Sequence, residues 1–245
     1  MKQSEREHLK QNPVADALTA VSGAFDQHRA PFLAIGGTIL AVLVGIGGYL
    51  TWQRNKDATV SGLLADAMIV YEAPVQAPAP PGMEGGIGVP AQAPGTYPTE
   101  RAKLEAALPK FLAAAESAPA STPGRLARLN AAAALVALGR FDEATTHYEQ
   151  LASGTDIVAK GAALGKAQAQ MRAGQFDQAI EGLKVLSTQD AAAMPVDGVL
   201  MELARAYRGS GKLDDARKTL TEIVEKHAES PFAAEARAEL DKFSS

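Results

Sequence analysis

The residue types that most often carry catalytic or metal chemistry are few and scattered in this sequence. Its four histidines are His8, His28, His147 and His227, and none has a second histidine or a carboxylate at a metal-ligand spacing that rises above background. Cysteine is absent, which excludes a disulfide framework, a thiolate zinc site and a cysteine nucleophile. We therefore predict no metal site, and we expect His147 and His227 to lie on the surface near helix ends.

Motifs for nucleophilic or nucleotide chemistry are also missing. The sequence has no Gly-x-Ser-x-Gly elbow and no phosphate-binding loop, because its glycine-rich pieces fall in an apolar segment and in a proline-rich segment. The pair Asp214-Asp215 could form a carboxylate dyad, but it belongs to a repeated phrase in which one acid begins a helix and the next faces solvent. We therefore predict no catalytic residue, no cofactor and no small-molecule substrate. An enzyme accessory or an unrecognised hydrolase is the alternative class.

The charge of the chain argues against nucleic-acid binding. The formal net charge is -4 with a pI near 5.6, and the sequence contains no basic run. A nucleic-acid-binding domain would normally carry a basic patch. Hydrophobic residues make up 47% of the chain but aromatic residues only 5%, which suits tightly packed, alanine-rich helices.

A short phrase occurs three times and organises the second half of the sequence. It is ALGRFDEA at 137–144, RAGQFDQA at 172–179 and GSGKLDDA at 209–216, so that Gly139, Gly174 and Gly211 lie 35 and 37 positions apart. A period of this size is typical of stacked helical pairs. The glycine would end the first helix in a left-handed turn, and the acid that follows favours the start of the second helix.

This phrase resembles the tetratricopeptide repeat. That pattern has a small residue in the first helix, a glycine at the turn and an alanine where the two helices cross; the matching positions here are Ala132, Ala167 and Ala204, then the three glycines, then Ala144, Ala179 and Ala216. The repeats are degenerate, because Arg128 and Ala163 stand where the family has a large aromatic residue. The resemblance implies an all-α solenoid of antiparallel helix pairs over residues 99–245.

Before the repeats, one apolar segment has the length of a membrane span. No side chain from Ala30 to Gln53 is charged, and these 24 residues would span about 36 Å as a helix, enough for a hydrocarbon core of about 30 Å. We predict a retained single transmembrane helix over 30–53, preceded by a polar tail over 1–29. The small residues Gly37, Ala41 and Gly45 could let another transmembrane helix approach, although glycine is common in such helices anyway.

Between the apolar segment and the repeats, the composition changes twice. Residues 54–72 have helical periodicity and predict a membrane-proximal helix, whereas 73–98 contain seven prolines and five glycines and predict a linker or an inserted loop. From there on the pattern predicts helices only, at about 99–117, 124–138, 141–153, 156–173, 176–188, 195–209, 213–228 and 231–243. We expect Pro195 and Pro231 in first turns and the last helix to cap the array.

The surface predicted to act is the inner face lined by the first helices of the pairs. Its candidate protein-binding residues are Leu129, Ala133 and Val136 in the first repeat, Leu164, Gln168, Met171 and Arg172 in the second, and Met201, Arg205 and Arg208 in the third. Methionine offers adaptable apolar contact, and arginine can hold carboxylates of a partner. Ordinary packing or solvation is the alternative for each of them.

The order of parts is similar to that of the YfgM-like family of bacterial inner-membrane tetratricopeptide proteins, which are ancillary subunits of the Sec translocon. The resemblance implies a cytoplasmic amino terminus, periplasmic repeats, and protein partners such as the channel, periplasmic chaperones or emerging secreted polypeptides. Charges next to the apolar segment do not decide its orientation, because Arg29 on one side faces Arg54 and Lys56 on the other. A scaffold for envelope assembly or cell division, of the outer-membrane assembly or Tol-associated type, is the alternative.

Overall fold

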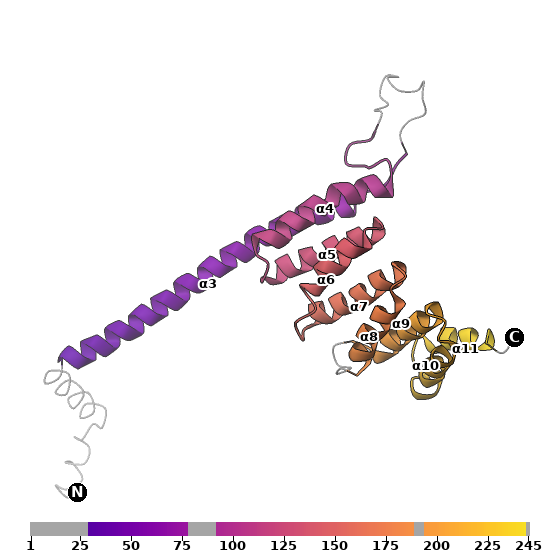
Figure 1. Ribbon diagram of the computed structural model, residues 1–245. Coiled ribbons are helices and arrows are strands. Elements are labelled where there is room, and N and C mark those ends of the chain that lie inside the picture. Colours follow the sequence, from indigo (N-terminus) through magenta and orange to yellow (C-terminus); the bar gives the residue numbers. More distant parts are fainter. Residues whose placement is uncertain (1–28, 78–91, 189–193, 244–245) are drawn as a thin grey trace, which may run out of the picture. The chain divides into compact units, whose positions relative to one another are not determined.

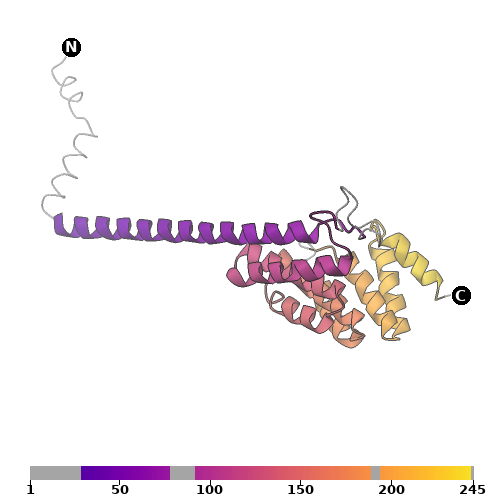
Figure 2. The same cartoon turned by 90° about the horizontal axis from the view of Figure 1, so that it is seen from above.

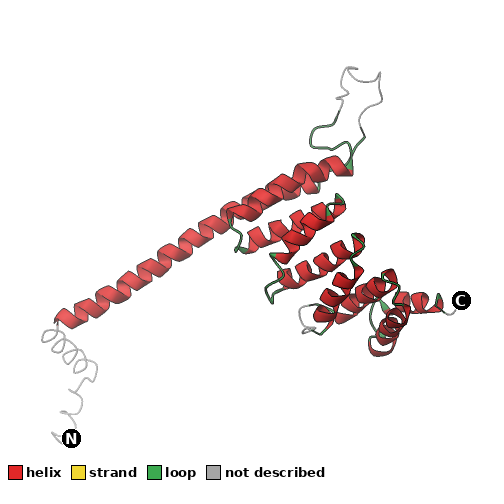
Figure 3. Cartoon of the chain, viewed as in Figure 1, coloured by secondary structure: helices red, strands yellow, loops and turns green. Residues whose placement is uncertain are grey.

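The structure is a computed structural model that describes the backbone of residues 29–77, 92–188 and 194–243, with side chains from residue 38 onward. Every regular element in these ranges is an α-helix (Figure 3). The helices are α3 Arg29–Tyr71, α4 Glu100–Ser117, α5 Thr122–Ala137, α6 Phe141–Glu149, α7 Ile157–Arg172, α8 Phe176–Ser187, α9 Val196–Gly209, α10 Leu213–Lys226 and α11 Ala233–Asp241 (Figure 1). The predicted all-α class is confirmed.

The chain divides into two units, residues 1–55 and residues 56–245, which are considered separately. The described part of the first unit is the beginning of α3, and the predicted tail over 1–29 lies outside the described residues apart from Arg29. Within the described part of the chain, no helix is both long and apolar enough to cross a membrane, so the predicted span over 30–53 is not confirmed. Of the three small residues predicted to pack there, Gly37 has no described surroundings, while Ala41 and Gly45 are exposed.

In the second unit, the last turns of α3 pack beside α4 (Figures 1 and 2). Ala67 is fully buried in the same core cluster as Phe111, and the Tyr71 ring meets the Phe111 ring edge-on at 5.7 Å. The helix predicted over 54–72 is thus the end of α3. Next to it, Val75 and Tyr97 form an isolated parallel bridge, which brings the two described ends of the proline-rich segment together.

The three repeated glycines end the first helix of each pair as the sequence predicted. Gly139, Gly174 and Gly211 have φ of 78°, 77° and 78°, a left-handed backbone conformation that residues with a Cβ rarely adopt. At the first turn, the Gly139 N–H donates to the Val136 carbonyl and the Arg140 N–H to the Leu135 carbonyl, and the other two turns repeat this pattern. These are Schellman caps, which satisfy the last carbonyls of α5, α7 and α9.

Small residues then let the two helices of each pair cross closely. Ala144, Ala179 and Ala216 are all 0% exposed at the start of the second helices. In the first helices, Ala132, Ala167 and Ala204 are buried as well. A longer side chain at these crossings would separate the backbones, because the interior is already packed at crystal density.

Successive helices contact each other along the whole stack, and first helices also contact first helices: α5 lies against α7, and α7 against α9. Three predicted boundaries were wrong. The helix predicted over 141–153 ends at Glu149, and Leu151 is buried from the turn that follows it. The last helix begins at Ala233, so that Pro231 precedes it and Phe232 takes the cap position; Pro195 likewise caps α9 instead of entering its first turn.

Candidate functional site

The candidate site is the face formed by the first helices α5, α7 and α9. Each carries one stripe of residues spaced by four and then three positions, which places them on the same side of a helix. The stripes are Leu129, Ala133 and Val136 on α5, Leu164, Gln168 and Met171 on α7, and Met201, Arg205 and Arg208 on α9. Because the three helices are neighbours in the stack, the stripes form a candidate surface of three parallel rows.

The rows on α5 and α7 are half-buried and mostly apolar. Leu129 and Val136 pack on the edge of the first core cluster, and Leu164 and Met171 pack on the edge of the second. Gln168 is half-buried between the two apolar residues of its row. Part of each side chain therefore remains exposed, and a partner could cover it with a gain from apolar burial.

The row on α9 differs, because its methionine is internal. Met201 is 1% exposed and belongs to the second core cluster together with Ala204 and Leu220. The predicted contact role of Met201 therefore does not fit this structure: its side chain fills the core between α9 and α10. Sequence spacing alone could not show this, since it places Met201 at the same position as the half-buried Leu164.

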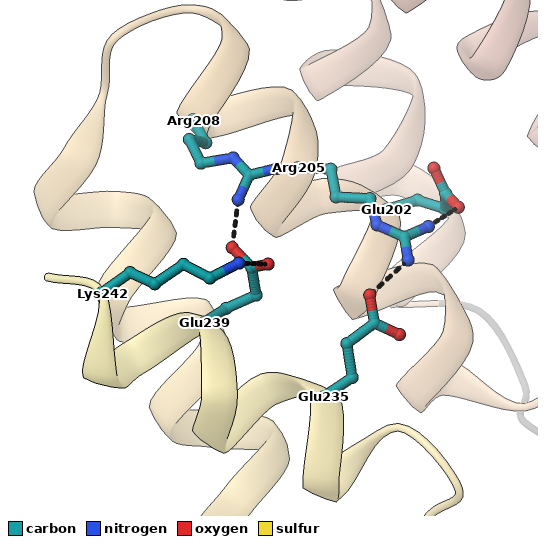
Figure 4. Close-up of polar contacts among 6 residues, drawn as sticks. All are labelled: Glu202, Arg205, Arg208, Glu235, Glu239 and Lys242. Atoms are coloured by element: carbon teal, nitrogen blue, oxygen red, sulfur yellow. Dashed lines mark hydrogen bonds and ion pairs between the residues drawn. The ribbon is translucent and has the colours of Figure 1, made fainter.

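The two arginines of the α9 row are held by α11 (Figure 4). The Arg205 guanidinium donates at 2.7 Å to Glu202 and at 2.7 Å to Glu235 of α11, and Arg208 pairs with Glu239. Lys242 donates to the other oxygen of Glu239 at 2.7 Å. Arg205 and Arg208 do hold carboxylates, as their chemistry predicted, but the carboxylates belong to the same chain.

These contacts alter the proton affinities of two of the groups involved. The hydrogen bond from Lys242, followed by the charge of Arg208, holds the pKa of Glu239 below its ordinary value. The hydrogen bond to Glu235 raises the pKa of Arg205 further above neutrality. Glu239 and Arg205 are therefore charged at neutral pH, and α11 closes the arginine side of the third repeat.

Arg172, the last residue of α7, lies elsewhere. It is exposed and lines a cleft at the glycine turns together with Phe141, Asp142 and Gln175. These three residues were not among the predicted site residues. The signal that could have found them is the variation beside the repeated glycines, where Gln175 occupies the place of Lys212.

Among the described residues, no group of three or more histidine or acidic side chains is placed to hold a metal ion. His147 lies near the end of its helix as predicted, in the last turn of α6, but its side chain is half-buried rather than fully exposed. Burial, followed by the charge of Arg128, lowers the pKa of His147, and its Nδ1 has no hydrogen-bond partner among the atoms described. His147 is thus neutral at pH 7 and packs within the repeat.

Comparisons with known proteins find the repeat in this sequence. The family model of the tetratricopeptide repeat matches residues 199–230, which cover most of α9 and all of α10. A search of curated proteins gives no significant match. Among solved structures, a kinesin light chain candidate of Podosopora anserina with nearly identical TPR-like repeats is 19% identical over 57% of this chain and 77% of that chain, with a TM-score of 0.49. A point variant of the same protein is 20% identical over 52% of this chain and 70% of that chain, with a TM-score of 0.44. The chain thus carries a tetratricopeptide repeat, a unit whose stacks provide extended binding surfaces.

Proposed function

We propose that this protein is a scaffold that binds other proteins through the apolar rows of α5 and α7. The observation that carries this proposal is the pair of half-buried apolar rows, Leu129 and Val136 beside Leu164 and Met171, on neighbouring first helices. Such rows suit an apolar stretch or an amphipathic helix of a partner. No catalysis, cofactor or small-molecule substrate is required.

We propose further that the scaffold is anchored in a membrane by residues 30–53. The support is the absence of charge from Ala30 to Gln53 and the exposure of the large apolar side chains on the first part of α3, which ranges from 47% for Leu50 to 67% for Val44. Tyr49 and Trp52 lie 6.1 Å apart near the end of this stretch, where aromatic rings prefer the membrane interface. The tail would be cytoplasmic and the repeats periplasmic.

The proposed site of action is the exit of the Sec translocon in a bacterial inner membrane, as the resemblance to the YfgM-like family implies. Emerging polypeptides expose apolar segments before they fold, and the rows on α5 and α7 would hold such segments or the chaperones that receive them. The acidic net charge and the proposed membrane anchor over residues 30–53 are compatible with this role. A scaffold for envelope assembly would use the same face with other partners.

The partner proposal is tested by crosslinking in cells, followed by purification of the full chain in mild detergent. A variant with Leu164→Gln and Met171→Gln should lose the specific partners, because two apolar contacts of the α7 row become polar. The matched control replaces exposed apolar residues of second helices, Val185→Gln and Leu213→Gln, which are 60% and 50% exposed. Translocon subunits, chaperones or secreted chains that depend on the row support the proposal, whereas partners retained by the row variant would refute it.

The anchor proposal has its own test. Protease added to spheroplasts should digest the repeats and leave a fragment protected by the membrane. A carboxyl-terminal part that survives in intact spheroplasts but is digested after lysis would show that the proposed orientation is wrong. If the full chain were recovered in the fraction released from membranes without detergent, the proposal of a membrane anchor would be refuted.

A further inference from the structure

Two junctions between neighbouring repeats have the same backbone at their glycine turns but different side chains. At the junction between the second repeat (α7 and α8) and the third (α9 and α10), the Phe176 ring lies over Gly209, where an added Cβ would come within 2.2 Å of a ring carbon. Lys212 Nζ also reaches Asp177 Oδ1 of the preceding repeat at 2.7 Å. An aromatic contact and an ion pair thus close this junction.

The junction between the first repeat (α5 and α6) and the second is open at the equivalent place. Arg172 stands where the other junction has Gly209, and Gln175 stands where it has Lys212. Phe141 therefore shares the cleft with an arginine instead of a glycine, and Asp142, the equivalent of Asp177, shares it with a neutral amide. These substitutions leave a cleft of about 560 Å³.

Two of the four charged side chains in this cleft are paired with each other and two are not. Arg140 and Glu143 pair with each other, with Arg140 Nε donating to Glu143 at 2.6 Å. Asp142 and Arg172 make no ion pair and no side-chain hydrogen bond to any other residue that the structure describes. Among the described residues, the cleft therefore presents an unpaired anion and an unpaired cation beside the half-buried Phe141 ring.

We propose that this cleft binds a segment of a protein partner that carries a lysine for Asp142 and an acidic side chain for Arg172. The closed junction shows the chemistry of the first contact, because Lys212 supplies to Asp177 the ammonium group that Gln175 cannot supply to Asp142. The second contact follows from guanidinium chemistry, since arginine binds carboxylates through two parallel donors. The proposal rests on the proposed protein-binding function and adds a polar subsite at the carboxyl-terminal end of α7, beside the glycine turns.

The charge pattern favours a mixed-charge segment over a purely acidic or basic one. A purely acidic segment would pair with Arg172 but be repelled by Asp142, and a purely basic one would meet the reverse arrangement. Each contact between exposed charges strengthens binding by about threefold to fivefold, so the two together give at most about 25-fold. The subsite thus selects among partners without dominating their affinity.

The test uses a phage-displayed library of random dodecapeptides panned on the purified full chain, and calorimetric titration of the enriched peptides. Enriched peptides should contain a lysine together with an aspartate or glutamate. Their affinity should fall about threefold to fivefold in Asp142→Asn and in Arg172→Gln, which each remove one contact. The matched control is Asp177→Asn at the closed junction, which should leave peptide affinity unchanged.

A variant that supplies the missing ion pair separates a loss of binding from a loss of folding. Gln175→Lys gives Asp142 an ammonium from within the chain, so it should weaken the peptides by a similar factor while its melting temperature stays equal or rises. Three outcomes would each overturn the proposed subsite. The enriched peptides could lack a lysine or an acidic residue, they could bind Asp142→Asn as tightly as the parent chain, or the library could yield no binder. The row variant Leu164→Gln with Met171→Gln separates the two proposals: it should lose the cellular partners yet still bind the peptides.

Discussion

The junctions on either side of the second repeat share their backbone and differ in what fills them. Both follow a glycine with φ of 77° or 78° and the same pair of capping hydrogen bonds, so that the second helices begin in the same geometry. One junction is closed by Phe176 on Gly209 and by Lys212 with Asp177, whereas the other leaves Asp142 and its neighbours in an open cleft. The comparison teaches that a repeat's backbone sets the register of the stack, while two side chains beside the turn decide whether the junction offers a binding surface.

The same contrast applies to the rows of the first helices. The rows on α5 and α7 stay partly exposed, whereas the row on α9 has its methionine in the core and its arginines paired with α11. The first two repeats are therefore open on their rows and at the junction between them, whereas the third is closed on its row and at its junction with the second. Binding is therefore expected at the first two repeats rather than at the third.

The largest effect on stability is expected where the two helices of a pair cross, a feature that all three repeats share. Ala179→Leu should lower the free energy of unfolding by about 1–3 kcal/mol, because the alanine is fully buried and the extra atoms must push two helices apart. Ala144→Leu should cost a similar amount if the repeats are equivalent in their packing. Urea denaturation measures both, with Ala137→Leu at an exposed position as the control; a variant that unfolds like the parent would show that the crossing is misplaced.

A smaller effect should separate the two junctions. Gly209→Val must displace the Phe176 ring, which is half-buried and can swing outward, so we expect a loss of about 1–2 kcal/mol. Arg172→Val at the equivalent open position should change stability by less than about 0.5 kcal/mol, as is usual for exposed sites. Equal losses in urea denaturation would mean that the two junctions are packed alike.

The ion pair of the closed junction should contribute less again. Lys212 and Asp177 are 46% and 82% exposed, so solvent screens their attraction and Lys212→Ala should cost at most about 0.5 kcal/mol. High salt should abolish this difference, because it screens exposed charges. The corresponding substitution at the open junction, Gln175→Ala, should show no salt dependence, and a salt-dependent loss there would argue for a hidden ion pair.

The last effect is a dependence on pH, and it concerns the polar contact that ties the first two repeats at the other end of their helices. Asp156 caps α7 and accepts two hydrogen bonds from Arg125 of α5; the bonds from Arg125, then that from the Ala159 N–H, lower the pKa of Asp156 to about 2. Because the folded pKa lies below the unfolded value of 3.8, the contribution is present above about pH 4 and is lost as the pH falls through 2. In thermal melts, Asp156→Asn should flatten the loss of stability across this window; an unchanged profile would contradict the assignment.

Much of the fold could be predicted from the sequence because it depends on local chemistry. A glycine at a fixed period, with an acid and an alanine at fixed distances after it, specifies a turn, a helix start and a crossing, and the helix boundaries mostly follow within two residues. The exception at α6 has a physical reason: Leu151 continued the apolar pattern, but it is buried from the turn after the helix has ended.

The site could be predicted only in part, because it depends on contacts between repeats. The sequence placed Met201, Arg205 and Arg208 in one row. It did not show that glutamates of α11 would pair with the two arginines of that row. A clue was available in Glu235 and Glu239, which are spaced to face Arg205 and Arg208 once the two helices are neighbours. The cleft at Arg172 required a comparison of two junctions in space.

The most direct test of the account places a photo-crosslinking amino acid at Gln168 in one variant and at Arg205 in another, since these residues occupy equivalent positions in the second and third repeats. The full chain is irradiated in cells and its adducts are identified by mass spectrometry. The account predicts adducts to partner proteins from position 168 and adducts within the chain, to α11, from position 205. Partner adducts from position 205 with none from position 168 would contradict it.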